Sequence, residues 1–237
     1  MEHQKIAAWY NQNYAAAGLN AQRRYPNEEL LRFMGRHYFR VPHAERQQIR
    51  VLELGCGSGA NLWMLAREGY QTCGLDLSSE AIQLAGQMLA QWQTTAELKV
   101  GSMTAPPWTA ASFDVVLDVF SAFCLNMAEF GRCLQAVHRV LKPQGRFFMF
   151  TPSKRSEAFT HPGDAKFLDD STLDGIRRPD APYAGNHYPF RFVHPAELKT
   201  QLEAHGFEVT YLETVGRTYR QEQEYFEFVV AEAVRGS

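Results

Sequence analysis

The sequence predicts a doubly wound, Rossmann-like α/β fold with a seven-stranded, mostly parallel sheet and helices on both faces. Short apolar runs alternate with helical patterns from about residue 49 onward, and this spacing is typical of βαβ units. A turn with three glycines, VLELGCGSGAN at 51–61, joins the first apolar run to a helix. The last two runs, 208–216 and 222–233, are separated by a polar link from Arg217 to Gln223, which predicts an antiparallel hairpin at the sheet edge.

The other elements follow from the same patterns. Five strands are expected at the short apolar runs 49–55, 70–77, 96–103, 112–120 and 145–152. Four helices are expected at 60–69, 78–92, 127–145 and 194–207. Gly69 is a plausible terminator of the first helix, and Ser78 or Ser79 is available as the N-cap of the second. Pro143 and Gly145 stop the third helix.

Two segments do not fit the alternation, and we expect both to cover a binding site. Residues 1–48 have a helical pattern and many aromatic side chains. Residues 153–192 are irregular and aromatic, as in a substrate lid inserted after the fifth strand. The expected organisation is an N-terminal helical segment, 1–48, followed by one domain, 49–237, that contains the lid. Two alternatives stay open: the N-terminal aromatic residues could only pack on the sheet, and 153–192 could be a surface excursion.

Composition and charge narrow the class of protein. The 237 residues are 45% hydrophobic and 21% charged, which is ordinary for a folded globular chain. A net charge of −2 gives no electrostatic footprint for nucleic acid, and no apolar run approaches the ~20 residues that cross a bilayer. The N-terminus lacks a secretory signal pattern, and the four cysteines lack zinc-ligand spacing. We therefore expect a cytoplasmic monomer or homodimer that binds no nucleic acid, membrane or metal.

The glycine turn predicts a site for a nucleotide-like cofactor. Gly55, Gly57 and Gly59 let the chain bend sharply and let a ligand approach bare backbone at a helix N-terminus. Asp76 ends the next strand, where a carboxylate can accept the hydroxyl protons of a ribose; the alternative is a helix N-cap. The spacing alone does not exclude NAD. Glu53, just before the turn, favours a cationic ligand over a pyrophosphate.

These motifs together resemble those of class I S-adenosylmethionine (SAM)-dependent methyltransferases of the small-molecule branch. The resemblance rests on E-x-G-x-G-x-G followed by Asp76, on SFDVVLDVFSAF as a fourth strand, and on AVHRVLKPQG as a helix end. It covers roughly residues 49–150, and the final helix and hairpin match in order. The resemblance implies that the cofactor is SAM and the product S-adenosylhomocysteine.

The resemblance also implies a role for individual residues. The loop Gly55–Gly57 would pack on the methionine part, Asp76 would hold the ribose, and Asp118 would approach the methyl group. Ser102 stands where the family often has an aspartate that bonds the adenine. The implied cofactor-binding residues are Glu53, Gly55, Cys56, Gly57, Asn61, Asp76, Leu77, Ser102, Met103, Asp118 and Val119.

The expected acceptor is a small molecule, methylated on oxygen or nitrogen. His187, with Tyr188 beside it, is the candidate general base, although most histidines are surface or core residues. Candidate substrate contacts are Tyr14, Tyr25, Phe120, Phe123, His161 and Tyr183. A secondary metabolite, sugar or cofactor precursor fits an aromatic insertion that has six basic and six acidic residues between Ser153 and Phe192. The alternatives are an RNA or protein methyltransferase, or a SAM-binding protein without catalysis.

Overall fold

The computed structural model describes residues 2–236, with side chains from residue 7 onward, and it confirms the predicted fold class. Its helices are α1 (Glu2–Ala17), η1 (Leu19–Ala21), α2 (Glu28–His37), α3 (His43–Arg46), α4 (Leu62–Arg67), α5 (Ser79–Gln91), η2 (Ala122–Cys124), α6 (Met127–Val140), α7 (Glu157–Thr160) and α8 (Pro195–Ala204). Its strands are β1 (Arg50–Leu54), β2 (Gln71–Asp76), β3 (Glu97–Val100), β4 (Phe113–Val119), β5 (Leu141–Pro152), β6 (Phe167–Asp169), β7 (Thr172–Leu173), β8 (Phe190–Arg191), β9 (Phe207–Tyr219) and β10 (Glu224–Arg235).

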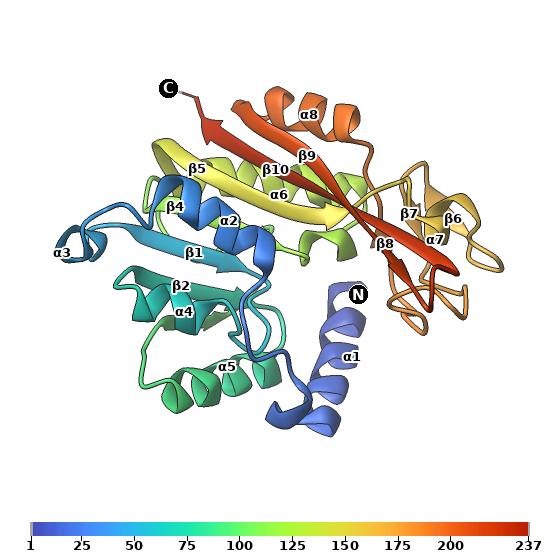
Figure 1. Cartoon of the computed structure of the whole chain (residues 1–237), viewed down its shortest axis with the longest axis horizontal. Helices are drawn as coiled ribbons and strands as arrows, with labels where there is room; N and C mark the ends of the chain where they lie inside the picture. Colours follow the sequence, from blue (N-terminus) through green and yellow to red (C-terminus); the bar gives the residue numbers. More distant parts are fainter. Residues whose placement is uncertain (1, 237) are drawn as a thin grey trace.

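Within the described chain, seven strands form the main sheet in the order β3-β2-β1-β4-β5-β10-β9 (Figure 1). The pairs from β3 through β5 are parallel, whereas β10 is antiparallel to both β5 and β9. The predicted edge hairpin is therefore confirmed. The chain runs outward from β1 to β3 and then returns to the other side of β1 as β4. This reversal places a topological switch point between β1 and β4.

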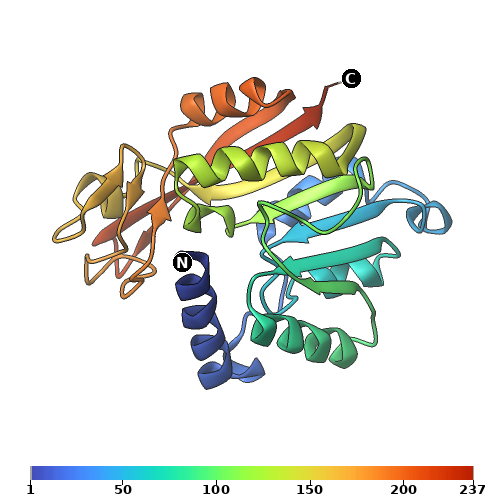
Figure 2. The ribbon, with the colours of Figure 1, turned by 180° about the vertical axis from the view of Figure 1, so that it is seen from behind.

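The strands carry side chains alternately to two faces, and helices cover both. On one face, Phe130 of α6 and Leu198 of α8 join a core with Leu52 and Val116. Figure 2 shows α6 and α8 lying across this face. On the opposite face, α2 and α4 pack on the alternate strand residues, and the Phe33 and Phe148 rings lie 5.0 Å apart. Because alternate residues of each strand are buried on opposite faces, the sheet has a core on both sides, as a doubly wound fold requires.

α6 ends earlier than the sequence pattern predicted, since the helix was expected to continue to residue 145. The helix ends at Val140, and the next residue, Leu141, already begins β5 and pairs with Phe113. Pro143 disfavours helical backbone in the residue before it, so the chain leaves the helix early. The expected strand at 145–152 is therefore longer in the structure. Ser78 caps α5 by accepting a hydrogen bond from the amide of Ala81.

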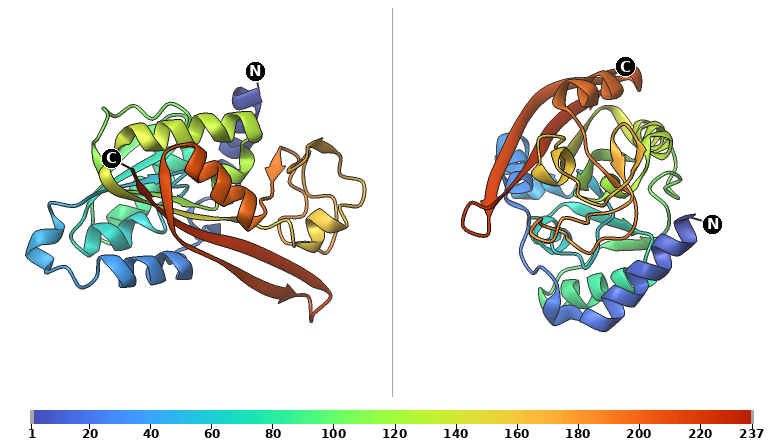
Figure 3. Two further views of the ribbon diagram at one scale, coloured as in Figure 1. Left: turned by 90° about the horizontal axis from the view of Figure 1, so that it is seen from above. Right: turned by 90° about the vertical axis from the view of Figure 1, so that its right-hand side faces the viewer.

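Parts of the two segments outside the alternation, α1 and residues 153–192, lie at the carboxyl-end edge of the parallel strands, whereas α2 packs on a face of the sheet. α1 runs beside α5, and residues 153–192 fold into α7 and a small sheet in the order β6-β7-β8. Figure 3 shows the β9–β10 hairpin extending beyond the main sheet alongside this insertion. The hairpin holds the insertion through a hydrogen bond from Ser153 Oγ to Glu227 Oε1, 2.7 Å, and through the ion pair between Arg178 and Glu224. The insertion is thus anchored at its base.

We expect Phe148→Ala to lower the free energy of unfolding by about 3–5 kcal/mol, since it deletes a fully buried ring that packs on α2. Leu31→Ala, on α2 but 37% exposed, is the matched control and should cost less than about 1 kcal/mol. Urea unfolding measures both. Equal losses in the two variants would contradict the account of how α2 packs.

Candidate cofactor and acceptor site

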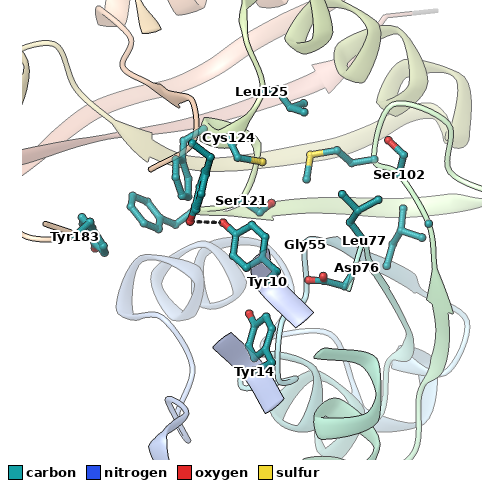
Figure 4. A pocket seen from close by; sticks show the side chains of 16 residues that line it. Tyr10, Tyr14, Gly55, Asp76, Leu77, Ser102, Ser121, Cys124, Leu125 and Tyr183 are labelled. Carbon is teal, nitrogen blue, oxygen red and sulfur yellow. Dashed lines mark hydrogen bonds between the residues drawn. The ribbon is translucent and has the colours of Figure 1, made fainter. Parts of the chain in front are cut away.

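A cavity of about 280 Å³ lies where β1, β2, β3 and β4 end, at the switch point of the sheet. The loops after these strands form one wall, and α1 and the insertion form the other (Figure 4). The lining residues are Tyr10, Tyr14, Gly55, Leu75, Asp76, Leu77, Gly101, Ser102, Met103, Phe120, Ser121, Phe123, Cys124, Leu125, Tyr183 and Tyr188.

Two other parts of the chain, the loop after β4 and helix α1, lie very close to the backbone of the glycine turn. Gly55 has φ +60°, and a Cβ there would lie 2.2 Å from the Cβ of Ser121. Gly57 has φ +51°, and a Cβ there would lie 2.9 Å from the hydroxyl oxygen of Tyr14. Cys56 points away from the cavity into a small core with Leu62. Only glycine permits both the left-handed backbone and these contacts.

Asp76 joins the turn to the start of α5. Its Oδ2 accepts a hydrogen bond from the amide of Gly57, and its Oδ1 accepts one from the amide of Ser78, both at 2.9 Å. Burial raises the pKa of the Asp76 carboxyl, and these backbone donors oppose that rise. A carboxylate has about four lone-pair sites, so two remain for a ligand's hydroxyl groups. Leu77, Ser102 and Met103 continue the wall on this side of the cavity.

A chain of polar side chains lies beside the turn rather than in the cavity lining. The buried Glu53 carboxylate accepts a hydrogen bond from Asn61 Nδ2, and its Oε2 has no partner among the described atoms. Asn61 Oδ1 accepts from Arg23 Nη2 at 3.2 Å and from the amide of Asn27 at 2.9 Å. Burial raises the pKa of Glu53 to about 8. A carboxyl group and a guanidinium are therefore linked through Asn61 beside the glycine turn, next to the cavity.

The other end of the cavity is aromatic. The hydroxyl groups of Tyr10 and Tyr188 hydrogen-bond at 2.7 Å and so connect α1 to the insertion. Phe120 and Tyr183 have ring centroids 4.6 Å apart, and both have positive φ, +60° and +66°. Such backbone is strained for bulky residues and is commonly found at functional sites. Phe123 completes this wall.

The four tyrosines of the cavity are hydrogen-bond donors rather than bases. Burial raises the pKa of Tyr10, Tyr14, Tyr183 and Tyr188 above the ordinary value. Each phenol is therefore protonated at neutral pH. It can hold a ligand oxygen or nitrogen without removing a proton from it.

Three residues predicted to act at the site lie outside the cavity. His187 is exposed, and its Nδ1 contacts Arg177. His161 is exposed and contacts the hydroxyl of Thr160. Tyr25 is 64% exposed and packs against Trp63 and Trp92 on the outer side of α4. The positions of these side chains do not support a catalytic or substrate role.

The two residues at the end of β4 are buried beneath the site. Asp118 is fully buried and hydrogen-bonds the backbone of Ser121 and Ala122, and Val119 is buried in the sheet core. Asp118 therefore shapes the segment above it and does not reach the cavity. Sequence reasoning named Phe123 in that segment but missed Ser121, Cys124 and Leu125, which also line the cavity. The sequence feature that could have pointed to these residues is their position directly after the fourth strand.

Neither a metal cluster nor a membrane-spanning helix emerges in the described part of the chain. No group of three or more His, Cys, Asp or Glu side chains between residues 7 and 236 is arranged to hold a metal ion. No helix within 2–236 combines the length and the apolar character needed to cross a bilayer.

Comparison with known sequences identifies the central part of the chain. A family model described as a methyltransferase domain matches residues 51–145. A ubiquinone biosynthesis O-methyltransferase from Bartonella tribocorum is 25% identical over 171 residues, which are 72% of this chain and 64% of that protein. This chain therefore spans slightly less than two thirds of that relative.

Solved structures share the fold. A SAM-dependent methyltransferase from Methanosarcina mazei has a TM-score of 0.64 and 22% identity, over 79% of this chain and 92% of that one. The 1,6-didemethyltoxoflavin-N1-methyltransferase of Burkholderia thailandensis, solved with its substrate and S-adenosylhomocysteine, has a TM-score of 0.63 and 16% identity. That match covers 100% of this chain and 91% of the other. At these identities the likeness shows the fold.

The raised pKa of Glu53 predicts a pH dependence of stability. Below the unfolded-state value near 4.5 the carboxyl is protonated in both states, and up to about pH 8 only the folded state keeps the proton. The free energy of unfolding should therefore fall as pH rises through this window, by about 1.4 kcal/mol for each pKa unit. Urea unfolding at pH 5, 6.5 and 8 should show a shallower fall in Glu53→Gln. Parallel curves for the two proteins would contradict the assignment.

The contact between Gly55 and Ser121 predicts a coupled pair of substitutions. Gly55→Ala should cost about 3 kcal/mol or more, because it adds a clash to an unfavourable φ. Ser121→Gly should destabilise the wild type but stabilise Gly55→Ala, since it removes the clash and leaves only the backbone strain. A double-mutant cycle in urea measures the coupling. Additive effects would show that the two residues do not touch.

Proposed function

We propose that this chain, whose residues 51–145 match a methyltransferase domain, is a class I SAM-dependent enzyme that transfers a methyl group from SAM to oxygen or nitrogen of a small-molecule acceptor. The observation that carries the proposal is one cavity with two chemically different ends. Asp76 and the glycine turn lie at one end, and aromatic side chains from α1, the β4 loop and the insertion lie at the other. A cofactor and an apolar acceptor would meet between them.

The residues at the first end fit the expected cofactor. Asp76 retains lone pairs for the ribose hydroxyl groups, and Leu77 and Met103 offer apolar surface for the adenine. Arg23 provides a positive charge beside the turn for the carboxylate of a methionine group, and Glu53 provides a carboxyl group that the ammonium would ionise. The absence of an aspartate at Ser102 leaves the adenine contact to the backbone and to apolar packing.

The chain's part in the reaction is positioning and exclusion of water. Bound SAM supplies an electrophilic methyl group on a sulfonium sulfur. The rings of Phe120, Phe123 and Tyr183 would hold the acceptor in one plane, and fixing two reactants in this way is worth up to about 7–11 kcal/mol. The Tyr10–Tyr188 pair closes the cavity between α1 and the insertion, so it keeps solvent from the acceptor atom. The same hydroxyl groups can orient a polar group of the acceptor.

The acceptor that suits these walls is planar and largely apolar. Aromatic rings stack well on planar ligands, and the phenols supply a few hydrogen bonds that fix orientation. Two similar proteins are named a ubiquinone biosynthesis O-methyltransferase and a 1,6-didemethyltoxoflavin-N1-methyltransferase, which supports a small-molecule acceptor. The four cysteines are unpaired, as in a reducing compartment, and we place the reaction in the cytoplasm.

The proposal is tested by following the methyl group. Wild-type protein is incubated with methyl-labelled SAM and separate pools of small metabolites, tRNA and protein, and label is expected in the metabolite pool. Asp76→Ala should lower the affinity for S-adenosylhomocysteine, measured by calorimetry, at least about tenfold, because it removes a carboxylate that forms charge-assisted hydrogen bonds with the ribose. It should lower methyl transfer in parallel.

Other outcomes lead to other functions. Label in tRNA or protein would favour a methyltransferase that acts on a polymer. S-adenosylhomocysteine binding without label in any pool would favour a protein that binds SAM without catalysis. Unchanged binding in Asp76→Ala would overturn the site. His187→Ala serves as the control, since its exposed ring lies outside the cavity and both binding and transfer should be unchanged.

A further inference from the structure

A short segment between β4 and α6 determines the shape of the cavity. Residues 121–125 include η2 and contribute four lining side chains, Ser121, Phe123, Cys124 and Leu125. Ser121 touches the glycine turn at Gly55, while Phe123 lies on the acceptor side and packs on Phe190 of the insertion at 4.4 Å. Movement of this segment would therefore alter both ends of the cavity together.

Asp118 holds the amides at the start of the segment. Its Oδ1 accepts hydrogen bonds from the amide of Ser121 at 3.0 Å, the hydroxyl of Ser121 at 2.5 Å and the amide of Ala122 at 2.9 Å. The side chain has no exposed surface. This arrangement satisfies the free amides of a short helical turn with one carboxylate oxygen.

Arg191, in the insertion, holds the carbonyls of the same segment. Its Nη2 donates to the carbonyl of Ala122 and its Nε donates to the carbonyl of Leu125, both at 3.2 Å. The guanidinium is fully buried, with its carbon 3.6 Å from the centre of the Phe130 ring. Arg191 of β8 thus binds a loop of the main sheet, and its partner Ala122 lies 69 positions earlier in the sequence.

The energetics of this arrangement favour a positioning role over simple stabilisation. Burial lowers the pKa of Arg191 to about 10, so it is still charged at neutral pH, and attraction between it and Asp118 offsets part of that change. One polar atom of each, Asp118 Oδ2 and Arg191 Nη1, has no hydrogen-bond partner among the described residues. Buried charges of this kind are often no more stabilising than apolar side chains of the same volume. Their benefit lies in fixing one arrangement of the backbone.

We propose that Arg191 is a positioning residue which, together with Asp118, holds residues 121–125 in the arrangement that joins the acceptor wall to the glycine turn. The inference rests on the proposed function for its purpose, because a methyl acceptor must be aligned with the cofactor. The insertion then does more than cover the site. Through Arg191 it sets the position of a cavity wall that belongs to the main domain.

The alkylation rate of Cys124 measures how firmly residues 121–125 are held, and the measurement needs no methyl acceptor. Its thiol lines the cavity, is half-buried, and has a pKa raised by burial to about 12, so alkylation should be slow in the wild type. Cys73, buried in β2 and away from Arg191, serves as the internal reference. Peptide mapping after timed exposure to iodoacetamide measures each cysteine separately.

In Arg191→Met, alkylation of Cys124 should be at least about tenfold faster, because the guanidinium that donates to the Ala122 and Leu125 carbonyls is gone and the segment it holds opens locally. Alkylation of Cys73 should stay within about twofold of the wild type. Arg178→Met is the matched control, since Arg178 also belongs to the insertion and pairs with the buried Glu224, yet does not touch residues 121–125. It should leave Cys124 as slow as in the wild type.

A double variant separates positioning from stability and keeps the test valid if Arg191→Met folds poorly. Asp118→Asn with Arg191→Met removes both buried charges, so the free energy of unfolding should recover toward the wild-type value. Cys124 should nevertheless remain fast to alkylate, because the donors to the Ala122 and Leu125 carbonyls are gone. A wild-type alkylation rate of Cys124 in the double variant would overturn the inference. Equal acceleration of Cys124 and Cys73 in Arg191→Met would overturn it as well.

This experiment and the methyl-transfer experiment fail in different ways. Alkylation requires neither SAM nor an acceptor, so absence of methyl transfer would leave its outcome intact. A protein that transfers methyl groups but shows no change at Cys124 in Arg191→Met would keep its proposed function and lose the role of Arg191. Where transfer is measured, Arg191→Met should raise the KM for the acceptor more than it lowers kcat.

Discussion

The contact between the glycine turn and the segment after β4 is the constraint on which the site depends. The Cβ of Ser121 fills the space where a side chain at position 55 would lie, and the Ser121 hydroxyl oxygen lies 2.8 Å from the carbonyl oxygen of Leu54. Two neighbouring parallel strands, β1 and β4, therefore end in loops that pack directly on each other at the switch point. The cavity forms beside this contact, between the cofactor end and the acceptor end.

The closure of the cavity depends on side chains that are far apart in the sequence. Tyr10 and Tyr188 are 178 positions apart, and their hydrogen bond brings α1 against the insertion. Asn11 of α1 also accepts a hydrogen bond from the hydroxyl of Ser78, at the start of α5. α1 is thus held at both sides of the cavity by a few polar contacts. Such contacts are individually weak, which suits an element that covers a binding cavity.

The electrostatics of the site differ between its two ends. Carboxyl groups gather around the turn, where burial raises the pKa of both Glu53 and Asp76. A cationic cofactor would favour their ionised forms, so binding and proton release are linked there. At the aromatic end the phenols stay protonated, and the wall is shaped by strained backbone at Phe120 and Tyr183. Recognition at one end is by charge, and at the other by shape.

Local patterns in the sequence determined the fold, because strand and helix periods, the cap at Ser78 and the need for glycine in a tight turn are properties of neighbouring residues. They also brought the turn and Asp76 together, since consecutive parallel strands end at the same edge. Only the tertiary structure decided which insertion residues point inward. His187 turns to solvent, while Tyr188 and Arg191 reach the site and the segment beneath it. Their directions depend on loop geometry and on partners more than sixty positions away, and no local period encodes either.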